Sequence, residues 1–142
     1  MSMIYEATTL DATKKIAQDF AKSLNSGDVV CMYGDLGAGK TEFVRAMAQE
    51  FGITDYITSP TFTIVNEYKG RLDLYHFDVY RIADSDEMYE IGYDEYIDGD
   101  GICVIEWAEL IDDILPPHRY NITINKDLAK GESYRKITIK EI

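Results

Sequence analysis

The residues with the clearest chemical meaning in this chain are the eight from 34 to 41, which read Gly-Asp-Leu-Gly-Ala-Gly-Lys-Thr. They fit the phosphate-binding loop pattern G-x-x-x-x-G-K-[ST]. In such a loop, glycines let backbone N–H groups turn toward phosphate oxygens, because no Cβ stands in the way. Lys40 would supply a positive charge for the β- and γ-phosphates, and the Thr41 hydroxyl would be a ligand for Mg²⁺. The pattern predicts nucleoside triphosphate binding, and the alternative is a glycine-rich turn with a solvated lysine.

The segments on either side of the loop favour phosphate binding over a simple turn. Residues 29–33 are a short apolar, β-branched run that follows a turn at 25–28, and they predict a buried strand. After the loop, apolar residues recur every three to four positions until Gly52, which predicts a helix. The positive end of that helix dipole would face the bound phosphates. We expect the nucleotide contacts to come from Asp35, Leu36, Gly37, Ala38, Gly39, Lys40, Thr41, Glu42 and Trp107.

A carboxylate suited to a magnesium site ends a second apolar run. Residues 102–105 read Ile-Cys-Val-Ile and are followed by Glu106 and Trp107. Phosphate-loop proteins use a central strand to deliver an acid beside the loop Ser or Thr, where it holds Mg²⁺ or its water. We expect Glu106 in that role beside Thr41, although aspartate is more usual there, and the alternative is a strand-end glutamate in solvent. Trp107 would pack structurally or stack near the nucleotide or a partner.

Residues 57–81 contain two β-rich runs around a turn at 69–70 and predict an antiparallel hairpin, so the sheet should be mixed. Alternation in the second run places His76 and Asp78 on one face, which is either functional or simply an exposed polar face. The first run starts near Ser59-Pro60-Thr61. In a nucleotide-binding protein, such a hydroxyl-rich loop can sense the γ-phosphate through Mg²⁺, whereas the tripeptide alone would be a turn.

The remaining segments predict scaffold elements. Residues 11–24 have the apolar spacing of an amphipathic helix with Thr9 as N-cap, and residues 84–98 predict one or two short acidic helices broken near Gly92. The runs 120–124 and 134–140 alternate as a closing hairpin. We therefore expect one α/β domain over residues 1–142, of the P-loop NTPase-like kind, with antiparallel hairpins in a mixed sheet flanked by helices.

Composition limits the partners and the compartment. Fourteen basic against 26 acidic residues give a net charge of −12, which disfavours direct binding to nucleic acid and would attract a basic protein, or serve solubility alone. There is no apolar run near 18 residues and no signal-like start, so we expect a cytoplasmic protein without a membrane partner. Cys31 and Cys103 lie in the predicted strands and should be buried free thiols.

The segments described above resemble, in this order, the TsaE (YjeE) family of bacterial ATPases, which take part in making threonylcarbamoyladenosine in tRNA. The resemblance spans nearly the whole chain. It is carried by residues 34–41, by Ser-Pro-Thr-Phe-Thr at 59–63, by Tyr-His-Phe-Asp-Val-Tyr-Arg at 75–81 and by residues 102–107. It implies ATP and Mg²⁺ as cofactors, with residues 59–61 as a first switch segment and Glu106-Trp107 as a second.

The same resemblance implies roles for individual side chains. Lys40 would bind phosphate, Thr41 and Glu106 would organise Mg²⁺, and Asp78 would lie near the γ-phosphate to position water or act as general base. Lys40, Asp78 and Glu106 would thus be the catalytic residues. Adenine contacts would come from near the chain termini, around Glu6, Thr9 or Gly131. The implied partner is a complex of TsaD and TsaB, whose catalytic cycle the ATPase supports, so that tRNA is met only through the partners.

Three other activities remain open at this point. A GTPase usually carries N-K-x-D, and residues 125–127, Asn-Lys-Asp, have the aspartate one place early. A small-molecule kinase would use Asp78 as base for a substrate hydroxyl, but such enzymes normally have an arginine-rich lid and the five arginines here are scattered. A nucleotide-gated binding module would hydrolyse ATP negligibly by itself, because hydrolysis can need groups from a partner.

Overall fold

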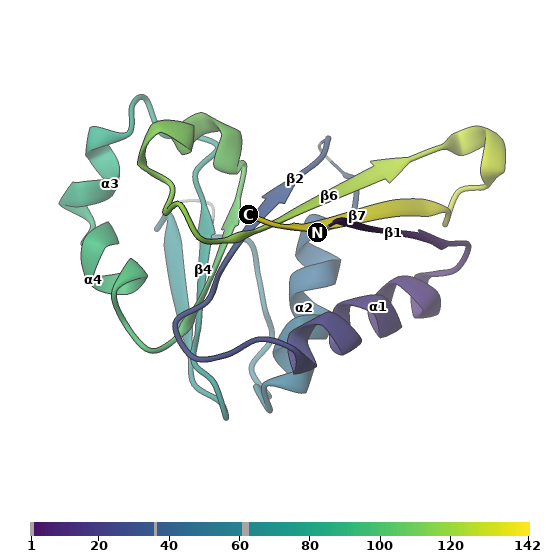
Figure 1. Ribbon diagram of the computed structural model, residues 1–142, viewed down its shortest axis with the longest axis horizontal. Coiled ribbons are helices and arrows are strands. Elements are labelled where there is room, and N and C mark those ends of the chain that lie inside the picture. The colour runs from purple at the N-terminus through teal and green to yellow at the C-terminus, as the bar shows by residue number, and fades with distance from the viewer. Residues whose placement is uncertain (1, 36, 61–62) are drawn as a thin grey trace.

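A mixed β-sheet with helices on both faces forms the framework of the computed structural model, which describes residues 2–35, 37–60 and 63–142 (Figure 1). Within these ranges the sheet has seven strands in the order β1-β7-β6-β2-β5-β4-β3. The strands are β1 (Ser2–Ala7), β2 (Val29–Tyr33), β3 (Val65–Tyr68), β4 (Leu74–Asp78), β5 (Ile102–Glu106), β6 (Tyr120–Lys126) and β7 (Arg135–Glu141). The helices are α1 (Leu10–Lys22), α2 (Lys40–Glu50), α3 (Asp86–Glu90), α4 (Tyr93–Ile97) and the 3₁₀ helices η1 (Ala108–Ile114) and η2 (Leu128–Lys130).

Four parallel strands occupy the part of the sheet that builds the site. β2 lies between β5 and β6 and is parallel to both, and β4 is parallel to β5. The pairs β1–β7, β6–β7 and β3–β4 are antiparallel, which confirms the predicted mixed sheet and its two hairpins. Because parallel strands end at one edge of a sheet, the carboxyl ends of β2, β4 and β5 meet there, and ligands bind at such edges.

The two faces of the sheet are covered by different helices (Figure 1). Alternate side chains of β2 explain the division: Val30 and Met32 pack with α1 and α2, whereas Val29 and Cys31 pack with α3, α4 and η1. β2 and β5 are therefore buried on both sides, as their continuous apolar sequences predict. Cys31 and Cys103 are buried free thiols, as expected from the sequence.

Several predicted elements are confirmed with adjusted ends. The Thr9 side chain caps α1 by accepting a hydrogen bond from the Ala12 N–H at 3.1 Å. Two short acidic helices, α3 and α4, flank Gly92, whose φ of 84° interrupts them. The first hairpin is shorter than expected, because β3 begins only at Val65. Ile64 has a left-handed φ of 68°, and the Ile57 carbonyl accepts from Arg45 Nε at 2.7 Å instead of from a neighbouring strand.

The N-terminal strand β1 and the 3₁₀ helix η1 were not predicted. β1 pairs with β7 at the sheet edge, where Met3 and Ile4 stay exposed, so its sequence shows no alternation of buried and exposed side chains. No helix in the described ranges is long and apolar enough to cross a bilayer.

Candidate nucleotide site

The loop between β2 and α2 has the backbone geometry that a phosphate cradle needs. Gly34, Gly37 and Gly39 all have positive φ, at 137°, 77° and 101°. A Cβ at Gly34 would lie 2.4 Å from the carbonyl oxygen of Ile124 on the neighbouring strand β6, so only glycine fits there. α2 begins directly after Gly39, so the N-terminal end of the helix adjoins the loop, as in other anion-binding loops.

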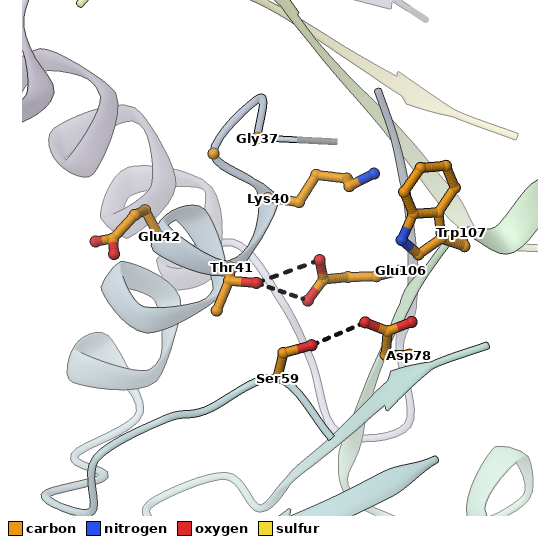
Figure 2. Close-up of a pocket in the computed structure, with 9 residues that line it drawn as sticks. Gly37, Lys40, Thr41, Glu42, Ser59, Asp78, Glu106 and Trp107 are labelled. Atoms are coloured by element: carbon orange, nitrogen blue, oxygen red, sulfur yellow. Dashed lines mark hydrogen bonds between the residues drawn. The ribbon is translucent and has the colours of Figure 1, made fainter. Parts of the chain in front are cut away.

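A cavity of about 400 Å³ opens beside this loop, and we call it the loop cavity. Its walls bring together residues from the loop, α2, the segment before β3 and the ends of β4 and β5 (Figure 2). The lining residues are Gly37, Gly39, Lys40, Thr41, Glu42, Ser59, Asp78, Glu106 and Trp107. Four segments that are distant in sequence, each predicted as functional, therefore meet at one cavity.

Thr41 and Glu106 lie next to each other in the wall of the loop cavity. The Thr41 hydroxyl lies 3.3 and 3.4 Å from the two carboxylate oxygens of Glu106 (Figure 2). The strand register explains the meeting, since Glu106 pairs with Met32 at the end of β2. Glu106 is only 3% exposed, so the alternative of a strand-end glutamate in solvent is wrong.

A buried histidine holds the other side of the Glu106 carboxylate. His76 Nε2 lies 2.5 Å from Glu106 Oε2, and His76 is 0% exposed. The alternative of an exposed polar face on β4 is therefore wrong for His76. For a lone histidine the sequence favours a structural role, and only the alternation that places His76 on the face of Asp78 pointed toward the site.

The Lys40 side chain contacts both the first residue of the loop and Trp107. Its Nζ donates to the Gly34 carbonyl at 2.5 Å and lies 3.6 Å from the centre of the Trp107 ring. Desolvation by burial lowers the pKa of Lys40, and the charges of Glu106 and nearby acids oppose that shift. The ammonium is thus held by a carbonyl and an aromatic face, on the side of the cavity nearest the loop amides.

Asp78 is fixed at the end of β4 next to Glu106, with which it pairs in register. The Ser59 hydroxyl donates to Asp78 Oδ2 at 2.8 Å (Figure 2), and the Tyr80 N–H donates to Oδ1 at 3.0 Å. Trp107 has a left-handed φ of 62°, and its ring lies 4.8 Å from that of Tyr80. Ser59 thus contacts Asp78, and Trp107 contacts Tyr80, two residues after Asp78. These contacts connect the Ser59 segment with the Glu106-Trp107 segment.

Some expected contact residues lie at or beyond the margin of the loop cavity. Asp35 is exposed and its carbonyl accepts the Ala38 N–H at 3.0 Å, so its side chain is not part of the lining. Glu42 lines the cavity, but its carboxylate points away from Thr41 and pairs with Arg45 (Figure 2). Leu36, and Thr61 of the predicted switch segment, lie outside the described residues.

A second cavity, of about 190 Å³, shares Gly39 and Glu42 with the first and reaches toward helix α1, and we call it the α1 cavity. Its other lining residues are Leu10, Thr13, Ala38, Glu132, Ser133 and Arg135. Arg135 fastens this side of the loop by donating from Nε to the Ala38 carbonyl at 2.8 Å. No sequence motif marks these residues, although Thr9 and Gly131, named above as near the adenine, are direct neighbours of Leu10 and Glu132.

A glycine-rich loop between a central parallel strand and a helix, with an acid at the end of the adjacent strand, defines the P-loop class of fold. The chain matches the model of one family of that class over residues 7–137, described as threonylcarbamoyl adenosine biosynthesis protein TsaE. The chain therefore belongs to the TsaE family, as its sequence motifs indicated.

Individual relatives agree with this assignment. The protein TsaE of Bacillus subtilis (strain 168) is 46% identical over 93% of this chain and 81% of its own length. That of Treponema pallidum (strain Nichols) is 48% identical, over 82% of this chain and 84% of its own. The crystal structure of YdiB from Bacillus subtilis superposes with a TM-score of 0.85 at 39% identity, and the match covers 100% of this chain and 86% of that one.

Proposed function

We propose that this chain binds and hydrolyses ATP with Mg²⁺, and that it does so to support threonylcarbamoyladenosine modification of tRNA as a nucleotide switch on a TsaD–TsaB complex. One observation carries the proposal. The hydroxyl of Thr41 and the carboxylate of Glu106, 65 positions apart in sequence, lie 3.3 Å apart beside the loop lysine. The names of the TsaE relatives supply the pathway.

The donor set fits Mg²⁺ better than it fits the other common protein metals. Thr41 and Glu106 offer only oxygen ligands, which Mg²⁺ prefers. The residues that the structure describes include no group of three or more His, Cys, Asp or Glu side chains able to hold a metal by themselves. Mg²⁺ typically takes one or two protein ligands and completes its shell with phosphate oxygens and water. Thr41 and Glu106 would hold the ion, which neutralises charge on the β- and γ-phosphates when bound.

Lys40 and the loop amides bind the phosphates in this proposal. Gly37 and Gly39 turn the backbone with positive φ, which aims successive N–H groups at an anion. Lys40 exchanges its bond to the Gly34 carbonyl for phosphate oxygens, so that an internal partner is replaced by a more strongly charged one.

Asp78 positions the attacking water. Its carboxylate lines the same cavity as Glu106, yet it is held by different donors, the Ser59 hydroxyl and the Tyr80 amide. Those two bonds leave acceptor capacity on both oxygens, because an ionised carboxylate offers about four lone-pair sites. Ser59 joins the switch segment to this group, so a change at the γ-phosphate would reach residues before β3.

The base of the nucleotide lies in the α1 cavity, which continues the loop cavity past Gly39. A buried hydroxyl supports this placement: Thr13 Oγ1 has no hydrogen-bond partner within the described residues, although Thr13 lines the α1 cavity. A bound base or ribose would give that hydroxyl a partner and would cover Leu10, which is 48% exposed.

Phosphate release from ATP and from GTP, measured with and without the TsaD–TsaB complex, tests the proposal. We expect ATP to be the tighter ligand, turnover to rise with the partner complex, and no acceptor to become phosphorylated. Asp78→Ala should lower turnover while ATP affinity is kept. Tighter GTP binding would favour a GTPase, and a phosphorylated small molecule would favour a kinase. ATP binding without turnover, even in the complex, would indicate a nucleotide-gated binding module.

A further inference from the structure

Glu106 is a buried carboxylate that hydrogen-bonds to two side chains among the described residues. It is 3% exposed, and its carboxylate is hydrogen-bonded to Thr41 on the loop side and to His76 on the side of the sheet. A buried carboxylate is costly unless it is hydrogen-bonded. The side chain that holds Glu106 from within the protein therefore controls where its oxygens point.

The strand register sets His76 beneath Glu106. β4 runs parallel to β5, with His76 opposite Val104 and Asp78 opposite Glu106. His76 and Asp78 share a strand face, and His76 lies two residues further from the carboxyl edge. Its ring thus reaches Glu106 from the core, whereas Thr41 reaches it from the loop.

The chemistry of the three groups fixes which atom of His76 carries a proton. An ionised carboxylate only accepts hydrogen bonds, and the Thr41 hydroxyl can donate to one of its oxygens. The 2.5 Å contact with Oε2 then requires that Nε2 donates. His76 Nδ1, at the other side of the ring, is buried without a partner among the described residues. An apolar residue would avoid that unpaired nitrogen, so the histidine must be explained by its Nε2 contact.

We propose that His76 is a positioning residue, which orients the Glu106 carboxylate so that Glu106 and Thr41 together hold Mg²⁺ beside the nucleotide phosphates. The inference rests on the proposed function. Hydrogen bonds from outside a metal's own ligands commonly orient those ligands, and their loss typically lowers metal affinity about 10- to 100-fold. His76 itself touches neither the metal nor the nucleotide in this proposal.

Three substitutions separate the hydrogen bond from packing. His76→Gln keeps an amide N–H near the position of Nε2, His76→Met keeps bulk but donates nothing, and His76→Asn places its amide nearer to Nδ1. Mn²⁺ affinity would be measured by electron paramagnetic resonance in the presence of the ATP analogue β,γ-imido-ATP, which is not hydrolysed. Binding of the same analogue in EDTA measures the site without metal.

We expect His76→Met and His76→Asn to lower Mn²⁺ affinity by about tenfold or more, with analogue binding in EDTA unchanged, and His76→Gln to restore most of the affinity. In a Glu106→Gln background, His76→Met should have no further effect, because it acts through Glu106. Urea unfolding of each variant shows that it is folded. If His76→Met does not fold, the comparison of His76→Asn with His76→Gln decides.

The inference is overturned if folded His76→Met or His76→Asn binds Mn²⁺ like the wild type, or if both lose metal-bound and metal-free affinity equally. The latter would mean a general structural role. If the wild type binds the analogue in a Mn²⁺-dependent way but all three His76 variants have the same Mn²⁺ affinity as one another, this inference is refuted and the proposed function stands. A wild-type chain that binds no analogue would refute both.

Discussion

Trp107 has a left-handed backbone conformation that places its ring beside two side chains of the site. The ring centre lies 3.6 Å from Lys40 Nζ and 4.8 Å from the centre of the Tyr80 ring. A non-glycine residue with positive φ is uncommon, and such strained positions gather at functional sites. The strain at Trp107 thus coincides with the loop cavity, directly after the acid at the end of β5.

Because Trp107 is the only tryptophan in the chain, ATP binding should change its emission. When phosphate draws Lys40 away from the ring, the charge next to the indole moves, and we expect a saturable change in intensity and wavelength. Lys40→Met should raise the ATP concentration at the midpoint by about tenfold or more, since a hydrogen bond to a charged group contributes about 1.5–3 kcal/mol. Calorimetric ATP binding with unchanged emission would show that Lys40 stays on Trp107.

At the scale of elements, the loop is fixed by a strand as well as by its own sequence. Gly34 approaches Ile124 on β6 so closely that a Cβ would lie 2.4 Å from the carbonyl oxygen. Arg135, at the start of β7, holds the Ala38 carbonyl. The β6–β7 hairpin therefore supports the loop from the side opposite β5.

Gly34→Ala should accordingly lower the free energy of unfolding more than a matched glycine substitution elsewhere. Gly131 is the control, because its φ of 123° is similar to the 137° of Gly34 but nothing lies within 4 Å of its Cβ position. Both changes impose backbone strain of roughly 1–3 kcal/mol, and only Gly34→Ala adds the clash with β6. Urea unfolding measures both; equal losses would argue that the hairpin contact does not constrain the loop.

Elements with a strong local pattern could be predicted from sequence, and those defined by distant partners could not. The apolar runs of β2 and β5, the periodic helix α2 and the glycine-lysine loop each carry their own signal. β1 lacks one because it is an exposed edge strand whose partner is β7, more than a hundred residues away. The first hairpin begins later than the sequence predicts because Arg45, on α2, donates a hydrogen bond to the Ile57 carbonyl.

The same distinction applies to the candidate site. Lys40, Thr41, Asp78 and Glu106 stand in motifs or at strand ends, so their convergence followed from parallel strands meeting at one edge. Thr13 and Arg135 of the α1 cavity belong to elements without a motif, and only the folded chain brings them to the loop. The role inferred for His76 depends on a side-chain contact, which alternation along β4 does not specify.

For the molecule as a whole, the two buried thiols should make the free energy of unfolding fall at alkaline pH. Burial raises the pKa of Cys31 and of Cys103 from 9.0 to about 12. Between these values the folded chain keeps protons that the unfolded chain releases, so the free energy of unfolding falls as pH rises above 9. The contribution is fully present below pH 9 and decreases by about 1 kcal/mol per thiol for each pH unit.

Urea unfolding at pH 8, 9 and 10 compares the wild type with the double variant Cys31→Ala, Cys103→Ala. The variant will be less stable throughout because it loses buried volume. Its stability should nevertheless decline less steeply between pH 9 and pH 10, since only the wild type has thiols to titrate. Parallel curves for the two proteins would mean that the thiols do not control the alkaline loss.

For the whole molecule, we propose that the loop lysine and the acid of β5 form one ATPase site that a partner complex activates. The most direct test is phosphate release from ATP by the chain mixed with TsaD and TsaB, for the wild type, Lys40→Ala and Glu106→Ala. We predict that both variants lose partner-dependent turnover and that Lys40→Ala also binds ATP more weakly. Turnover unchanged from the wild type in both variants would show that Lys40 and Glu106 do not form the ATPase site.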